Sequence, residues 1–205
     1  MKKIAIINCG TGNIASLINA LKFLEYESVL LDKPEKNYNF SHIIFPGVGS
    51  FGNLADNLNK LGFYDYLKEN KKRGNFLLGI CVGMQLLFKS SDEGKSSLGL
   101  NFIDGNLKLF STDKIQKLPI PHVGFAKVDF EYSKIWRDIP KNPYFYFIHS
   151  YRLTQIPEKI NYATSYYGEK FVSYVESENV FGSQFHPEKS HKTGLKFLNN
   201  FCNFK

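Results

Sequence analysis

The stretch Asn75-Phe76-Leu77-Leu78-Gly79-Ile80-Cys81-Val82-Gly83-Met84-Gln85-Leu86-Leu87-Phe88 decides which fold the chain is expected to adopt. Its first half is a short apolar run, and such a run predicts a buried strand of a parallel sheet. Met84, Leu87 and Phe88 then recur at helical spacing, so a helix is expected to follow the strand at once.

Cys81 lies at the turn between these two elements, between Gly79 and Gly83. This pattern is that of a nucleophile elbow with cysteine in place of serine. The glycines allow a sharp turn and keep bulk away from the sulfur, and the start of the helix favours negative charge on it. The pattern also fits a buried, inert cysteine, so partner groups are needed to decide.

Strands and helices alternate on the N-terminal side of this stretch. Strands are predicted at 3–8, 29–31 and 42–45, a helix across Leu17–Leu24, and two helices between Leu54 and Lys72 with a break near Gly62. This alternation predicts an open, mostly parallel α/β sheet with flanking helices.

The chain becomes β-rich after about residue 95, because short runs of β-branched and aromatic residues alternate with turn residues. These runs span 106–110, 123–130, 144–148, 162–167, 171–176 and 180–185. A last helix is expected across 191–204. Because no linker or repeat interrupts the chain, residues 1–205 are expected to form a single domain.

The composition is that of a globular protein, with 43% hydrophobic and 22% charged residues. The net charge of +7 comes from 23 lysines and only three arginines, and so few arginines argue against a nucleic-acid partner. No apolar run approaches the roughly 18 residues that span a bilayer, so no membrane partner and a cytoplasmic location are expected. Three distant cysteines are not a disulfide framework.

One candidate site is the loop Gly10-Thr11-Gly12-Asn13-Ile14-Ala15, which follows a strand and opens a helix. It matches the G-x-G-x-x-A dinucleotide fingerprint, and Asp32 lies 20 residues beyond Gly12, where a ribose-binding acid is expected. A nicotinamide-dependent oxidoreductase is therefore one hypothesis. Glycine-rich first turns also occur in open α/β sheets for backbone reasons alone.

A second candidate site combines Cys81 with His186 and Glu188. If the segment around Pro187 is extended, His186 and Glu188 point to the same side. A thiol nucleophile needs a base, and the base needs a group that fixes its tautomer. The N–H of Val82 and a second N–H from the turn at 46–49 could hold an oxyanion.

Five motifs, taken together, resemble the signatures of the class I glutamine amidotransferases and follow their order. They lie at 46–52 (PGVGSFG), 79–85 (GICVGMQ), 121–124 (PHVG), 147–151 (FIHSY) and 186–190 (HPEKS). Within that family they are most similar to the glutaminase subunits of imidazole glycerol phosphate synthases. The resemblance covers nearly the whole chain and implies a flavodoxin-like fold. It also assigns the loop at Gly10 to the family's first loop, which is not a nucleotide site.

The resemblance implies hydrolysis of glutamine by Cys81, with His186 as acid and base and Glu188 orienting it. Val48 and Val82 are then the oxyanion donors. The residues implied to hold glutamine are Gly49, Gln85, Ser150 and Tyr151. No metal or organic cofactor is implied, and His186 and His191 lack the further ligands of a metal site.

The implied partner is a (β/α)₈-barrel synthase of histidine biosynthesis, which receives the ammonia in a heterodimer. The residues that match its interface are Asn13, His122, Phe125, Tyr144 and Lys189. The family usually has Trp-Asn where this chain has Phe125-Ala126. A related subunit that supplies ammonia for a bacterial surface sugar is therefore an alternative. A catalytically silent interaction subunit, which keeps the fold but not the chemistry, is a further hypothesis.

Overall fold

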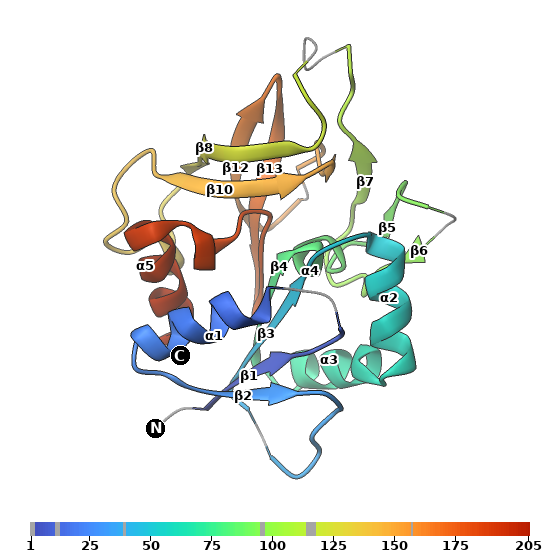
Figure 1. The fold of residues 1–205 in the computed structure, drawn as a ribbon, viewed down its shortest axis with the longest axis vertical. Helices are drawn as coiled ribbons and strands as arrows, with labels where there is room; N and C mark the ends of the chain where they lie inside the picture. Colours follow the sequence, from blue (N-terminus) through green and yellow to red (C-terminus); the bar gives the residue numbers. More distant parts are fainter. Residues whose placement is uncertain (1–2, 11–12, 39, 95–96, 114–117, 157) are drawn as a thin grey trace.

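The computed structural model describes residues 3–10, 13–38, 40–94, 97–113, 118–156 and 158–205. Among these residues, an eight-stranded sheet runs through the molecule in the order β2-β1-β3-β4-β14-β13-β12-β9 (Figure 1). Its strands are β1 (Lys3–Ile7), β2 (Glu27–Leu31), β3 (His42–Gly47), β4 (Phe76–Cys81), β9 (Asp129–Phe130), β12 (Asn161–Tyr167), β13 (Glu169–Ser177) and β14 (Val180–Ser183).

The strands from β2 to β14 in this order pair in parallel, whereas β14, β13, β12 and β9 pair antiparallel. The parallel part has the flavodoxin-like order, in which β1 lies between β2 and β3. A dinucleotide-binding sheet would instead place β1 between β2 and β4. The predicted open, mostly parallel, flavodoxin-like sheet is confirmed.

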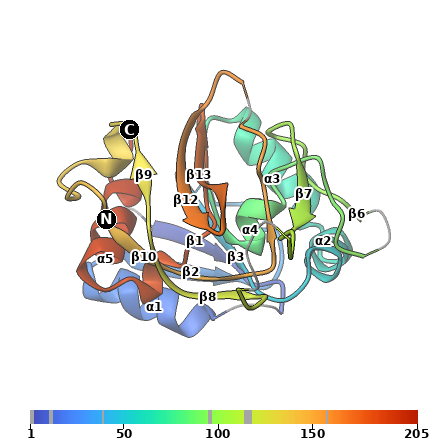
Figure 2. The same cartoon turned by 90° about the horizontal axis from the view of Figure 1, so that it is seen from above.

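Helices cover both faces of the parallel part (Figures 1 and 2). The helices α1 (Ile14–Phe23) and α5 (His191–Cys202) lie on one side, and α2 (Phe51–Lys60) and α3 (Phe63–Lys72) lie on the other. The apolar strands β1, β3 and β4 are buried between these layers, as the continuous hydrophobic runs predict.

Two smaller sheets lie above the end of the central sheet where β3 and β4 finish (Figure 1). The strands β8 (His122–Lys127) and β10 (Tyr144–His149) pair antiparallel, and we call them the β8–β10 ribbon. The second small sheet has the order β11-β7-β5-β6. Its strands are β5 (Ser90–Ser91), β6 (Ser97–Leu98), β7 (Asn106–Leu109) and β11 (Tyr151–Arg152).

The helix after β4 is shorter than the sequence predicts, because α4 comprises only Val82–Gln85. A turn follows at Leu86 and Leu87, and both side chains are buried there. The carbonyls of Leu86 and Leu87 accept hydrogen bonds from Leu100 and Phe102 at 2.7 and 2.8 Å, which replace a continued helix. The apolar residues after Gln85 are therefore buried in a loop, although their spacing in the sequence is that of a helix face.

Candidate active site

Cys81 ends β4 in a strained conformation, with φ of 55° and ψ of −111°. The flanking glycines are needed for close packing and not for positive φ values. A Cβ on Gly83 would lie 2.0 Å from the carbonyl oxygen of Phe45, and one on Gly79 would lie 2.5 Å from the backbone of Gly83. The elbow thus forms because α4 packs backbone to backbone against β3 and β4, and this packing supports the strain at Cys81.

His186 and Glu188 form the pair that the sequence predicts, but the segment is not extended. The strand β14 ends at Ser183, and Pro187–Lys189 form the 3₁₀ turn η2. In this turn, Nδ1 of His186 donates to Oε1 of Glu188 at 2.8 Å, and both side chains are buried. The expected geometry was wrong and the expected contact is present, because Pro187 starts a helical turn as readily as it holds an extended segment.

The environment of His186 favours the charged imidazolium. Burial by itself lowers the pKa of this histidine, but the negative charge of the Cys81 sulfur, hydrogen bonding to it and the Glu188 carboxylate outweigh burial and raise the pKa to about 10. Nε2 has no hydrogen-bond partner of ordinary geometry among the described residues. The sulfur therefore acts on the ring mainly through its charge, and Nε2 remains available for a reacting group.

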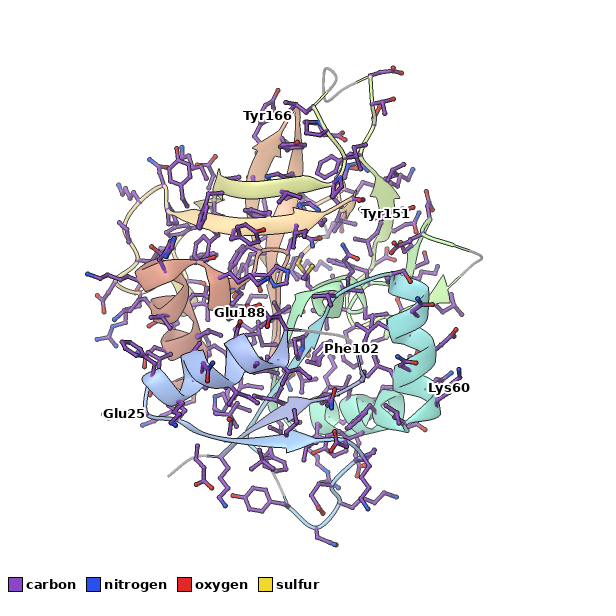
Figure 3. All side chains as sticks on the ribbon, viewed as in Figure 1. Glu25, Lys60, Phe102, Tyr151, Tyr166 and Glu188 are labelled. Carbon is purple, nitrogen blue, oxygen red and sulfur yellow. The ribbon has the colours of Figure 1, made fainter. Side chains whose placement is uncertain are left out.

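A cavity of about 270 Å³ opens beside the sulfur. Pockets for drug-sized ligands start at roughly 300 Å³, so this one suits a smaller molecule such as an amino acid. Figure 3 labels Tyr151, which lines the cavity, and Glu188, which accepts a hydrogen bond from His186. The lining residues are Val48, Gly49, Cys81, Val82, Gln85, Glu93, Pro121, Ile148, His149, Ser150, Tyr151, His186 and Lys189.

The cavity thus brings together Cys81, His186 and the residues predicted to bind glutamine or an oxyanion, while Glu188 lies behind His186. Glu93 and His149 were not predicted. Oε2 of Glu93 accepts a hydrogen bond from the N–H of Phe51 at 2.7 Å, which ties the start of α2 to the cavity rim. Glu93 lies in a polar loop without periodicity, so no sequence signal distinguishes it from a surface acid.

The predicted oxyanion donors lie on neighbouring strand ends. The parallel register pairs Gly47 with Cys81, so Val48 and Val82 follow directly after paired positions. Val82 is the first residue of α4, and the first N–H groups of a helix have no partner within it. Both residues line the cavity beside the sulfur.

His149 is buried beside the cavity in its neutral form. Burial lowers its pKa to about 3, although the hydrogen bond from Nδ1 to the carbonyl of Tyr151 at 2.9 Å acts in the opposite direction. Its Nε2 lies 3.3 Å from Nδ1 of His122, whose pKa burial lowers to about 4. Because the Tyr151 carbonyl only accepts, the proton of His149 is on Nδ1 and the contact with His122 is a donation from His122.

The residues predicted to contact a partner differ in exposure. Phe125 and Tyr144 are 47% and 60% exposed on the β8–β10 ribbon, Lys189 is exposed beside it, and Asn13 caps α1 in a half-buried position. His122 is the exception, since its side chain is only 3% exposed. Its ring stacks on the rings of Phe147 and Tyr167, with centroids 5.1 and 4.1 Å away. The His122 side chain faces the interior, and its place at the partner interface stays a prediction.

The competing dinucleotide site has no support in the fold. Thr11 and Gly12 lie outside the described residues. Asp32 accepts a hydrogen bond from Nδ2 of Asn8 at 2.7 Å, and Oδ1 of Asn8 accepts one from the N–H of Gly10 at 3.0 Å. The proposed ribose-binding acid thus holds the first loop, and the strand order differs from that of a dinucleotide-binding sheet.

Within the described parts of the chain, no group of three or more His, Cys, Asp or Glu side chains has an arrangement that could hold a metal ion. The helices described there are all too short or too polar to cross a bilayer. The cavity instead brings the Cys81 sulfur and the His186 imidazolium together with Val48 and Val82, the predicted oxyanion donors. These groups are suited to attack on an acyl carbon through a thioester.

The family model of the class-I glutamine amidotransferases matches residues 5–203. The chain therefore belongs to the class I glutamine amidotransferases.

Relatives of the chain carry a more specific description. The imidazole glycerol phosphate synthase subunit HisH of Chlorobium chlorochromatii (strain CaD3) is 39% identical over 201 residues, which cover 96% of this chain and 98% of that protein. The subunit of the same name from Sulfurimonas denitrificans is 37% identical over 203 residues, covering 98% of each. The structure of PurLQS from Thermotoga maritima has a TM-score of 0.75 at 21% identity, covers 99% of each chain and shares the fold.

Proposed function

We propose that this chain is the glutaminase subunit of an imidazole glycerol phosphate synthase in histidine biosynthesis. The observation that carries the proposal is the buried Cys81, His186 and Glu188 arrangement beside a small cavity. Its relatives are HisH subunits along nearly their whole length. The intact arrangement argues against a catalytically silent subunit.

The first half of the reaction forms a thioester. The Cys81 thiolate attacks the side-chain amide carbon of glutamine, and the N–H groups of Val82 and Val48 hold the negative oxygen of the tetrahedral intermediate. When this intermediate collapses, the imidazolium of His186 gives its proton to the departing nitrogen from Nε2. Ammonia leaves and a glutamyl thioester on Cys81 remains.

The second half restores the enzyme. Neutral His186 accepts a proton from water, and the resulting hydroxide attacks the thioester carbon. The carbon–sulfur bond breaks, glutamate forms and Cys81 is again a thiolate beside an imidazolium. Glu188 keeps Nδ1 protonated throughout, so that Nε2 is the atom that exchanges protons. Gly49, Gln85, Ser150 and Tyr151 hold the glutamine in the cavity.

The partner of this subunit is a (β/α)₈-barrel synthase, bound as a heterodimer in the cytoplasm. Ammonia in neutral water is mostly protonated and not nucleophilic, so it has to pass to the synthase without release. The β8–β10 ribbon offers an apolar surface for docking, because Val123, Phe125, Tyr144 and Ile148 are exposed on it. Lys189 lies next to this surface and also lines the cavity.

The test is co-expression with a barrel synthase and an assay with two nitrogen sources. Cys81→Ala is expected to abolish turnover with glutamine and to leave turnover with ammonium salts intact. Cys9→Ala is the matched control, since Cys9 is buried away from the cavity and burial raises the pKa of its thiol to about 12. Equal loss with both nitrogen sources would contradict ammonia transfer. Activation by only a sugar-modifying synthase would replace the histidine pathway with the surface-sugar alternative.

A further inference from the structure

Gln184 is a buried amide that lies next to the reactive sulfur and is not explained by the reaction steps above. It follows β14 directly, and its side chain is only 1% exposed. The backbone N–H of Gln184 donates to the backbone carbonyl of Ser173 on β13 at 2.9 Å, and this bond fixes the backbone at Gln184. Gln184 does not line the described cavity, so it lies on the protein side of the sulfur, away from substrate.

A chain of three hydrogen bonds fixes which end of the Gln184 amide faces Cys81. Nε2 of Gln85 donates to the carbonyl of Tyr151 at 3.2 Å and to Oε1 of Gln184 at 3.1 Å. A carbonyl oxygen only accepts, so the Tyr151 carbonyl sets the orientation of Gln85, and Gln85 sets that of Gln184. Nε2 of Gln184 is then left to point at Sγ of Cys81, 3.8 Å away.

An N–H group directed at the sulfur has different effects on its two protonation states. The thiol can donate to the carbonyl of Ile148, which lies 3.6 Å from Sγ. The thiolate has no proton to donate and only accepts, so the Gln184 N–H matches that state. A hydrogen bond to a charged group is stronger than one to a neutral group, and burial strengthens it further.

We propose that Gln184 is a positioning residue that stabilises the Cys81 thiolate and directs its lone pairs, with the amide held in the donor orientation by Gln85 and the Tyr151 carbonyl. The inference rests on Cys81 being the nucleophile of the proposed function. Because the amide does not titrate, this support is the same at every pH. It complements His186, which stabilises the same charge from the cavity side.

The test measures alkylation of Cys81 by iodoacetamide, followed at this residue by peptide mass spectrometry, in the free subunit and in complex with the synthase. Gln184→Met removes the donor and keeps the side-chain length. We expect the alkylation rate at pH 7 to fall about tenfold, the effect of one hydrogen bond to a charged group.

Gln184→Glu distinguishes whether the Gln184 side chain acts as a hydrogen-bond donor to the sulfur or only fills space beside it. Glutamate has nearly the shape of glutamine and still accepts from Gln85, so a purely structural role predicts that it is the milder change. The donor role predicts the reverse, because its carboxylate opposes a second negative charge and slows alkylation more than Met does. Ser183→Ala is the matched control, since the buried hydroxyl of Ser183 has no hydrogen-bond partner among the described residues.

The proposal is overturned if Gln184→Met alkylates at the wild-type rate while thermal unfolding shows a folded protein. It is also overturned if Gln184→Glu is the faster of the two variants. The readout does not use glutamine. A wild-type protein that alkylates as expected but fails to hydrolyse glutamine would therefore refute the proposed function and leave this inference standing.

Discussion

Gly83→Ala tests whether the elbow depends on backbone-to-backbone packing. The added Cβ would lie 2.0 Å from the carbonyl oxygen of Phe45, while carbon and oxygen atoms of this kind normally approach to about 3.3 Å. Because the obstacle is backbone oxygen inside β3, no side chain can turn away to make room. The helix α4 would have to move away from β3 by about 1 Å.

Two effects on stability oppose each other in this variant. Alanine is favoured over glycine within a helix by about 1 kcal/mol, and by less in a helix of a single turn. Overpacking a well-packed site costs about 1–3 kcal/mol, and rigid surroundings place this one at the upper end. We therefore expect the free energy of unfolding to fall by about 2 kcal/mol, which lowers Tm by about 4–8 °C in a chain of this size.

The effect on activity is expected to be larger than the effect on stability. The movement of α4 displaces the N–H of Val82, its first residue, relative to Cys81. A misplacement of about 1 Å costs about a hundredfold in rate. Glutamate release in complex with the synthase should fall by about that factor, while turnover with ammonium salts should remain, because the synthase itself is unchanged.

The assay pairs urea unfolding of the free subunit with glutamate release by the complex. Asn59→Ala is the control, because it also places alanine in a helix but at an exposed position of α2. Its stability should be unchanged or slightly increased. The reasoning is refuted if Gly83→Ala unfolds at the same urea concentration as the wild type and releases glutamate at the same rate.

Three further predictions concern buried ionisable side chains. Glu188→Gln removes a carboxylate that raises the pKa of His186, so this pKa should fall from about 10 in an NMR titration, and glutamate release should fall at least about a hundredfold. Arg152→Met leaves Glu169 buried without the guanidinium that donates to it from Nε at 2.9 Å, so urea unfolding should show a loss of about 3–5 kcal/mol, whereas unchanged stability would contradict the pairing. His149 is neutral when folded, with a pKa lowered to about 3, while the unfolded chain takes up a proton below pH 6.5. The contribution of His149 to the free energy of unfolding is therefore complete above pH 6.5 and is lost as the pH falls. The loss is at most about 1.4 kcal/mol per pH unit. His149→Asn should flatten the slope of unfolding free energy between pH 6.5 and 4.5.

The sequence predicted the parallel half of the fold because local patterns carry it. Buried parallel strands are continuous apolar runs, and the helices between them show their spacing and breaks, as near Gly62. The flavodoxin-like order of the strands became visible only in the structure, from the hydrogen-bonded pairing of neighbouring strands. Apolar spacing failed after Gln85, where a buried loop takes the place of a longer helix.

The sequence by itself predicted the chemistry at Cys81. A cysteine between glycines at a strand end, with His186 and Glu188 far along the chain, allows a nucleophile with its base. The five ordered motifs, which resemble those of the class I glutamine amidotransferases, then made this chemistry the prediction. The sequence could not show that the three meet, because the two parts are separated by 105 residues. Only the parallel pairing of β4 with β14 brings them together.

Tertiary structure alone decided the features that depend on contacts between distant backbones. The glycines at the elbow are required because strands and helix approach closely there, and no single segment carries that information. The sequence assigns His122 to the predicted partner interface, and only the structure shows that its ring is buried against Phe147 and Tyr167. The direction of the Gln184 amide follows from a carbonyl on β11. Orientation of a side chain is set by its neighbours in space, and a sequence shows only its neighbours in the chain.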